Sequence, residues 1–133
     1  MPAKTIWVVL HATEVNAVTI QVPKVVAERI GLRADLPKPA NGLVFLDRGP
    51  GVLQVMAMAD PTVGATRESI RGLIAVATPT KKLVFSVPKR VRLHLRLGRR
   101  DIVAWVVQEG AAKGHSVFLV RSAFRGLLRN LRP

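Results

Sequence analysis

The stretch LVFSVPKRVRLHLRL (residues 83–97) joins a β-rich run to a short amphipathic segment through the tripeptide Val-Pro-Lys. Pro88 has a fixed φ and no N–H, so it ends a strand and suits the first turn of a helix. Beyond the proline, Val91 and Leu95 have the spacing of one buried side over about two helical turns. The stretch therefore predicts a strand, a turn at the proline and a helix buried along one side.

A second copy of this pattern lies 65 residues earlier, in VTIQVPKVVAERIGL (residues 18–32). Both copies contain Val-Pro-Lys, and apolar residues occupy equivalent positions on either side of it. The matched apolar pairs are Val18 with Leu83, Ile20 with Phe85, Val26 with Val91, Ile30 with Leu95 and Leu32 with Leu97. Self-similarity at a fixed offset predicts two similar folding units in one chain.

Segments rich in β-branched and aromatic residues predict the strands of each unit. They are residues 6–12, 17–22, 43–46, 52–58, 72–78, 83–87, 102–107 and 116–121. Turn-forming residues between 43–46 and 52–58, and between 102–107 and 116–121, predict two β-hairpins. The polar TEVN between the first two segments predicts a third hairpin. The expected fold class is mainly β with short helices.

The repeat also sets the expected domain organisation. We expect a first unit over 1–58, a linker over 59–71, a second unit over 72–121, and a basic tail or helix over 122–133.

Positive charge is concentrated in the second unit. The chain has a net charge of +13, with 21 Lys and Arg against 8 Asp and Glu. Residues 1–80 contain 8 basic and 6 acidic residues, a net of +2, whereas residues 81–133 contain 13 and 2, a net of +11. Such a chain is expected to meet a polyanion. Nucleic acid fits better than a membrane surface, because the basic segments lack a strong Trp/Phe side.

Catalytic and metal-binding signatures are missing from the sequence. The chain has no Cys, its three His residues lack ligand spacing, and its eight acidic residues are scattered. No Gly-x-x-x-x-Gly-Lys phosphate loop occurs. We therefore expect no enzyme activity, no metal and no cofactor. We also expect a cytoplasmic protein, because no apolar run reaches the length of a membrane span and the N-terminus lacks the features of a signal peptide.

The segment KKLVFSVPKRVRLHLRLGRRDIVAWVV (residues 81–107) resembles the AbrB/SpoVT/MazE-type swapped-hairpin DNA-binding domain. Residues 18–35 carry a less basic version of the same pattern, and the resemblance covers about residues 5–58 and 72–121. Arg100 stands where the family has a Gly before its Asp, here Asp101.

The resemblance implies that two units interleave their hairpins into one compact barrel. In this chain the tandem units are expected to form a pseudo-twofold β-barrel by themselves, as an intramolecular pseudo-dimer. The alternative is that each unit pairs with another chain in a homodimer.

The candidate nucleic-acid-binding residues are the cations of the second unit and of the C-terminal segment. Arg suits this role because its planar fork binds phosphate or guanine bidentately, and Arg92 lies where family members often carry a DNA-contacting Arg. The alternative is a solvated surface. The candidates are Lys81, Lys82, Lys89, Arg90, Arg92, Arg96, Arg99, Arg100, Arg121, Arg125 and Arg129.

The expected function is binding of double-stranded DNA, as an AbrB-like transcriptional regulator or a chromatin-type, nucleoid-associated protein. Two alternatives stay open. One is association with RNA or the ribosome, which the charge fits equally well. The other is an antitoxin-like protein-interaction module, although the tail is basic where such tails are acidic or mixed.

Overall fold

A computed structural model describes residues 6–15, 18–33, 35, 37, 41–61, 63–64, 72–80, 82–98, 100–109 and 117–122. Of residues 6, 7, 108, 109, 121 and 122 it describes the backbone alone.

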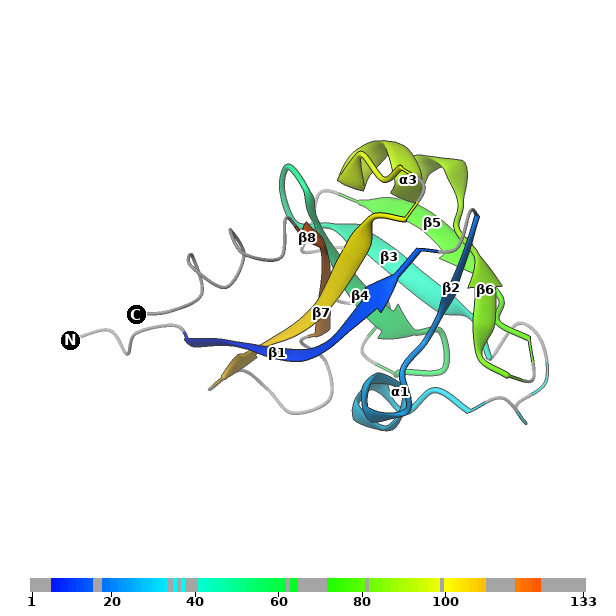
Figure 1. The fold of residues 1–133 in the computed structure, drawn as a ribbon. Helices are drawn as coiled ribbons and strands as arrows, with labels where there is room; N and C mark the ends of the chain where they lie inside the picture. The colour runs from blue at the N-terminus through cyan, green and yellow to red at the C-terminus, as the bar shows by residue number, and fades with distance from the viewer. Residues whose placement is uncertain are drawn as a thin grey trace.

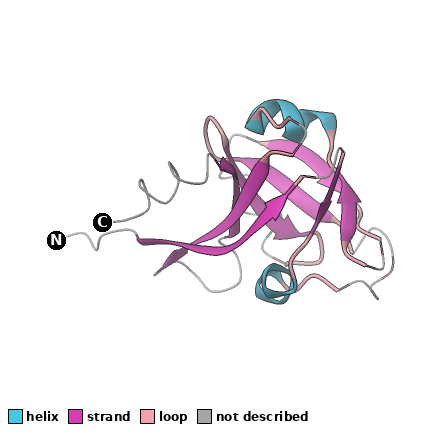
Figure 2. Cartoon of the chain, in the orientation of Figure 1, coloured by secondary structure: helices cyan, strands magenta, loops and turns pink. Residues whose placement is uncertain are grey.

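The described elements follow the same order twice. The first half contains β1 (Ile6–Glu14), β2 (Thr19–Gln21), α1 (Lys24–Ile30), β3 (Leu43–Asp47) and β4 (Val52–Ala57). The second half contains β5 (Leu73–Ala77), β6 (Val84–Ser86), α3 (Lys89–Leu95), β7 (Ile102–Glu109) and β8 (Val117–Ser122). The mainly β class with short helices is therefore confirmed (Figure 2).

Two of the three predicted hairpins are confirmed, and the third is wrong. β3 pairs with β4, and β7 pairs with β8, both antiparallel. The strands of the predicted N-terminal hairpin find partners elsewhere, since β1 pairs with β7 and β2 pairs with β6. Thr13 and Glu14 of the polar TEVN segment belong to β1 itself and pair with Val103 and Ile102. A polar segment between two apolar runs does not decide which strand supplies the hydrogen bonds.

The strand pairing has an internal twofold pattern. The six-stranded sheet has the order β1-β7-β8-β4-β3-β5, and β2 and β6 form a separate two-stranded ribbon. Each strand of the first half lies as far from one edge of the sheet as its counterpart in the second half lies from the other edge. The counterparts are β1 and β5, β3 and β7, and β4 and β8. β1 and β5 are the two edges of the sheet, so the described strands do not close on themselves. A closed barrel stays a prediction.

The main core lies between one face of the sheet and the ribbon. Ile20 and Phe85 are partners at the centre of the ribbon, and both are buried. The Phe85 ring centroid lies 5.7 Å from that of Phe45 on β3. Trp105 on β7 is fully buried in the same core, and its Nε1–H donates to Thr13 Oγ1 at 3.2 Å.

The opposite face of the sheet is also apolar. Its buried residues form two smaller clusters, one of Ala104, Val106, Phe118 and Val120 and the other of Val44, Leu46 and Met56. Strands buried on both faces need apolar residues at successive positions, which explains the continuous LVFL run of β3.

The two helices begin and end in the same way. Pro23 and Pro88 precede them with φ of −61° and −58°, and the side chains of Val26 and Val91 are fully buried. Each helix ends in a Schellman motif, in which Leu32 N–H donates to Ala27 O and its counterpart Leu97 N–H to Arg92 O, both at 2.9 Å. In Figure 1 the two helices lie at opposite ends of the molecule, joined by the ribbon.

Three described non-glycine residues have a left-handed backbone. They are Leu83, Arg96 and Arg100, with φ of 57°, 54° and 65°. Arg96 occupies the position that Gly31 occupies at the end of α1, where φ is 73°. A β-carbon makes this conformation costly, and glycine is the usual solution. The glycine that the family resemblance expects before Asp101 would therefore fit the backbone at Arg100.

Arg100 provides a test of this backbone strain. We expect Arg100→Gly to be more stable than Arg100→Ala by about 1 kcal/mol, because both variants remove the same charge and only alanine keeps the strained β-carbon. Urea denaturation of the two variants measures the difference. Equal free energies of unfolding would show that residue 100 does not need a left-handed φ.

Phe85 provides a test of the core between ribbon and sheet. We expect Phe85→Ala to lower the free energy of unfolding by about 3–5 kcal/mol, because it leaves a cavity where both halves meet. The control is Leu73→Ala on the exposed edge strand β5, for which we expect a much smaller loss. Similar losses for the two variants would contradict this account of the core.

Candidate nucleic-acid interface

Helix α3 exposes Lys89 and Arg90 because its apolar side is fixed in the core. The helix follows β6 directly after Pro88, and Val91 and Leu95 anchor it by burial. These two buried side chains lie on the same side of the seven-residue helix. The residues between them must therefore face solvent or the neighbouring strands.

The structure brings several of the predicted cations together around α3. Lys89 and Arg90 lie on the first turn of α3, and Arg96 immediately follows its last turn. The exposed predicted cations on or next to α3 are Lys89, Arg90, Arg96 and Arg100. Lys82 is also exposed but is not among them: it precedes Leu83, whose carbonyl oxygen accepts from Val22 N–H at 2.8 Å, directly before Pro23 and α1. Lys81, Arg99, Arg125 and Arg129 lie outside the described residues. Arg121 lies on β8, where only its backbone is described.

Arg92 differs from the other cations of α3. Its side chain is half-buried, and its Nε is buried without a hydrogen-bond partner among the described residues. Leaving a buried donor unpaired costs about 1–3 kcal/mol. A substitution at Arg92 would therefore act on folding as well as on any ligand. Arg92 is a poor residue with which to test binding.

The side chain of Arg90 on α3 reaches the edge strand β5. Its Nη1 is 3.5 Å from the carbonyl oxygen of Ile74 on β5, which is the long limit of a hydrogen bond. Most of the guanidinium's donors are left for other partners.

His94 connects α3 to the turn between β3 and β4, a role that the sequence did not indicate. Its Nε2 lies 2.9 Å from Gly49 O and 3.2 Å from Val52 O, and 3.7 Å from a carboxylate oxygen of Asp47. Carbonyl oxygens only accept, so Nε2 carries a hydrogen. The partners are backbone atoms more than 40 residues away, and a backbone carbonyl leaves no signature in a sequence.

The acidic residues near α3 bind backbone amides. Asp47 accepts a hydrogen bond from Gly49 N at 2.8 Å, and Asp101 accepts one from Gly98 N at 2.5 Å. The exposed cations Lys89, Arg90 and Arg96 form no ion pair with a described carboxylate.

Between described residues, one ion pair joins an Arg or Lys to a carboxylate, and it lies in the first half. Arg33 Nη2 is 2.6 Å from Asp35 Oδ2, and both side chains are about two-thirds exposed. The hydrogen bond from Arg33 lowers the pKa of Asp35 below its usual value. Local carboxylates therefore neutralise the first half more than the exposed side of α3.

A hollow of about 530 Å³ opens beside α3. It is lined by Pro50 and Gly51 of the β3–β4 turn and by Leu93, His94, Leu95 and Arg96. The corresponding part of α1 also borders a hollow, of about 350 Å³, lined by Glu28, Arg29, Ile30, Gly31, Ala59, Asp60 and Pro61. Among the described lining residues, the hollow at α1 has two carboxylates and the one at α3 has none. The two ends of the molecule therefore differ in charge at equivalent places.

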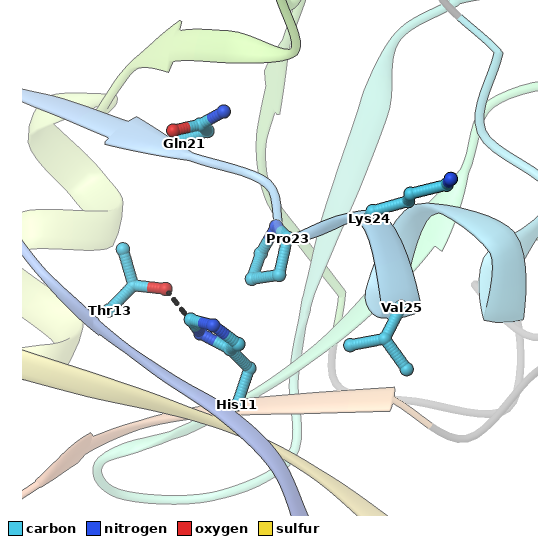
Figure 3. Close-up of a pocket in the computed structure, with 6 residues that line it drawn as sticks. All are labelled: His11, Thr13, Gln21, Pro23, Lys24 and Val25. Atoms are coloured by element: carbon cyan, nitrogen blue, oxygen red, sulfur yellow. Dashed lines mark hydrogen bonds between the residues drawn. The ribbon is translucent and has the colours of Figure 1, made fainter.

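A third hollow, of about 430 Å³, lies between β1, β2 and the start of α1 (Figure 3). Thr13 Oγ1 accepts from buried Trp105 and lies 3.3 Å from His11 Nδ1. Thr13 can therefore donate its hydroxyl hydrogen to that nitrogen. The Lys24 side chain extends away from the His11 ring. Among the described lining residues, Thr13 and His11 bond to each other and Lys24 points elsewhere, so they do not form a site for a charged ligand.

The chain matches no protein-family model, no curated protein and no solved structure. Neither of the helices within the described residues is long and apolar enough to cross a membrane. Among the same residues, no three His, Asp or Glu side chains gather as a metal site would require.

His94 provides a test of how α3 is held. We expect His94→Ala to lower the free energy of unfolding by about 1–2 kcal/mol, because two partly buried carbonyl groups lose their donor. We expect His94→Gln to lose less, because its side-chain amide can still donate. Chemical denaturation measures both. An alanine variant as stable as the glutamine variant would show that these hydrogen bonds do not hold the helix.

Proposed function

We propose that this protein binds double-stranded DNA through the end of the molecule that carries α3, as a transcriptional regulator or a chromatin-type protein. One observation carries the proposal. Exposed cations gather around α3 without described carboxylate partners, in a chain whose net charge is +13. Closely spaced positive charge without counter-charge is the electrostatic footprint of a polyanion-binding surface.

The arrangement of the strands supports the swapped-hairpin resemblance as part of this proposal. In that family two units interleave, and here β1 and β2 of the first half pair with β7 and β6 of the second. We propose that the two halves together stand in for two protomers of an AbrB-like pseudo-twofold barrel. The Val-Pro-Lys tripeptide precedes or begins the helix in both halves, as the resemblance requires.

Backbone strain also supports a role for the cations. Arg96 and Arg100 hold left-handed φ values at positions that glycine would occupy at lower cost. Residues kept in such conformations cluster at functional sites. At the equivalent helix end of the first half the residue is Gly31, which has neither the strain nor the charge.

The proposed mechanism is one-sided electrostatic docking. Arg guanidinium groups bind phosphate bidentately and release condensed counterions from DNA. At the other end of the molecule Val25 and Gly31 replace Arg90 and Arg96, so the first half completes the fold and contributes less charge. A twofold pair of equal contacts, as a palindromic site requires, would then need two copies of the chain.

A matched pair of triple variants tests this function. The test variant is Lys89→Gln, Arg90→Gln and Arg96→Gly, in which glycine removes charge and backbone strain together. The control is Lys24→Gln, Arg29→Gln and Arg33→Gln, which removes three charges from the first half. Fluorescence anisotropy with a duplex DNA and a structured RNA, titrated with salt, measures affinity.

We expect the test variant to bind DNA weakly, with a salt slope that is smaller by about 0.9 for each lost phosphate contact. The control should bind nearly as the parent protein does. Equal losses in the two variants would contradict docking through α3. Tighter binding of the parent protein to RNA would favour the ribosome-associated alternative. If neither nucleic acid binds at moderate salt, the positive charge serves an acidic protein partner.

A further inference from the structure

The most exposed large apolar side chain of the described residues lies in the middle of the cations of α3. Leu93 is 67% exposed, whereas the next such residue, Val18, is 49% exposed. Arg90 lies one helical turn before Leu93 on α3, and Arg96, which follows the helix, borders the same hollow as Leu93. A single exposed leucine is an ordinary surface feature. This leucine, however, lies between two cations that form no ion pair with a described carboxylate, and that position indicates a ligand.

The hollow beside Leu93 is partly apolar, and its described lining residues include no carboxylate; the nearest one, Asp47, lies behind His94 at 3.7 Å from its Nε2. Leu93 and Pro50 border the hollow beside α3, together with Arg96. In the first half the residue equivalent to Leu93 is Glu28, and its hollow also contains Asp60. The same backbone position thus carries an acid at one end of the molecule and an apolar side chain at the other. A ligand that fits the α3 end has anionic groups flanking an apolar one.

The major groove of duplex DNA has this combination. Phosphates line both of its edges, and each thymine presents a 5-methyl group to the groove, where apolar side chains contact it. Seven residues of helix are about 10 Å long, and the groove is about 12 Å wide. In Figure 1 α3 lies at an extremity of the molecule, with the turn between β3 and β4 beside it. Arg90 and Arg96 on either side of Leu93 correspond to the phosphates on the two edges of the groove, and Leu93 corresponds to a thymine methyl group between them.

We propose that Leu93 contacts thymine 5-methyl groups in the major groove while Arg90 and Arg96 bind the phosphates on either side. The inference rests on the proposed DNA binding and adds a sequence preference to it. Charge alone binds every duplex equally well, whereas contact with the methyl group favours sites that contain thymine.

The test uses two duplexes that differ only in the thymine methyl group. Alternating dA–dT and dA–dU duplexes of equal length are titrated with the full chain by fluorescence anisotropy at constant salt. We expect about fourfold tighter binding to the dA–dT duplex, the effect of burying one methyl group. Equal affinity for the two duplexes would overturn the role of Leu93 and leave DNA binding intact. Binding to neither duplex would overturn the proposed function as well.

Three variants assign the preference to Leu93. Leu93→Ala should bind both duplexes equally and keep the salt slope of the parent protein, because no charge changes. Leu93→Glu, which installs the residue of the first half, should bind both more weakly through repulsion of phosphate. Glu28→Leu, the reciprocal change at the far end, should keep the parent's ratio of affinities. A Leu93→Ala variant that still prefers the dA–dT duplex would overturn the inference.

We expect all of these variants to keep the fold, so that changes in affinity report on the DNA contact. Leu93 and Glu28 are both exposed, so their substitution leaves the core unchanged. We expect thermal unfolding of each variant within a few degrees of that of the parent chain.

Discussion

The pairing of β2 with β6 at Ile20 and Phe85 is the interaction on which the rest of the structure depends. Each half of the chain supplies strands whose hydrogen-bond partners lie in the other half. β1 pairs with β7 and β5 pairs with β3 in the same crossed manner. Buried backbone N–H and C=O groups must find partners, and neither half supplies them alone. The two halves therefore share the six-stranded sheet, the ribbon and the main core.

The crossed pairing also decides where the charge lies. Each strand of the ribbon is followed at once by a proline and a short helix, and the twofold pattern sends α1 and α3 to opposite ends of the molecule. The buried side of both helices is apolar because both face the same core. The exposed side is free of that constraint, so Val25 and Glu28 at one end correspond to Arg90 and Leu93 at the other. The two halves differ in sequence at these exposed positions, and the two ends of the molecule therefore differ in surface charge.

Local patterns predicted much of this fold correctly. The hairpins of β3 with β4 and of β7 with β8 join strands that are close in the sequence, so a short turn is enough to specify them. The helices after Pro23 and Pro88 follow from the geometry of proline and from apolar spacing. The predicted hairpin over 6–12 and 17–22 is wrong because the partners of those strands are about 65 to 100 residues away in the sequence. Apolar alternation shows that a segment is a strand and does not identify its neighbour.

By itself, the sequence determined the class of structure, the internal repeat, the buried side of each helix and the concentration of positive charge in the second half. These properties follow from residue type and spacing, which act over a few residues. Only the tertiary structure decided that Arg92 is half-buried, that His94 binds the carbonyl groups of a distant turn, and that Arg96 and Arg100 have left-handed backbones. Each of these depends on contacts between segments that are brought together by strand pairing across the two halves, and no local pattern specifies that pairing.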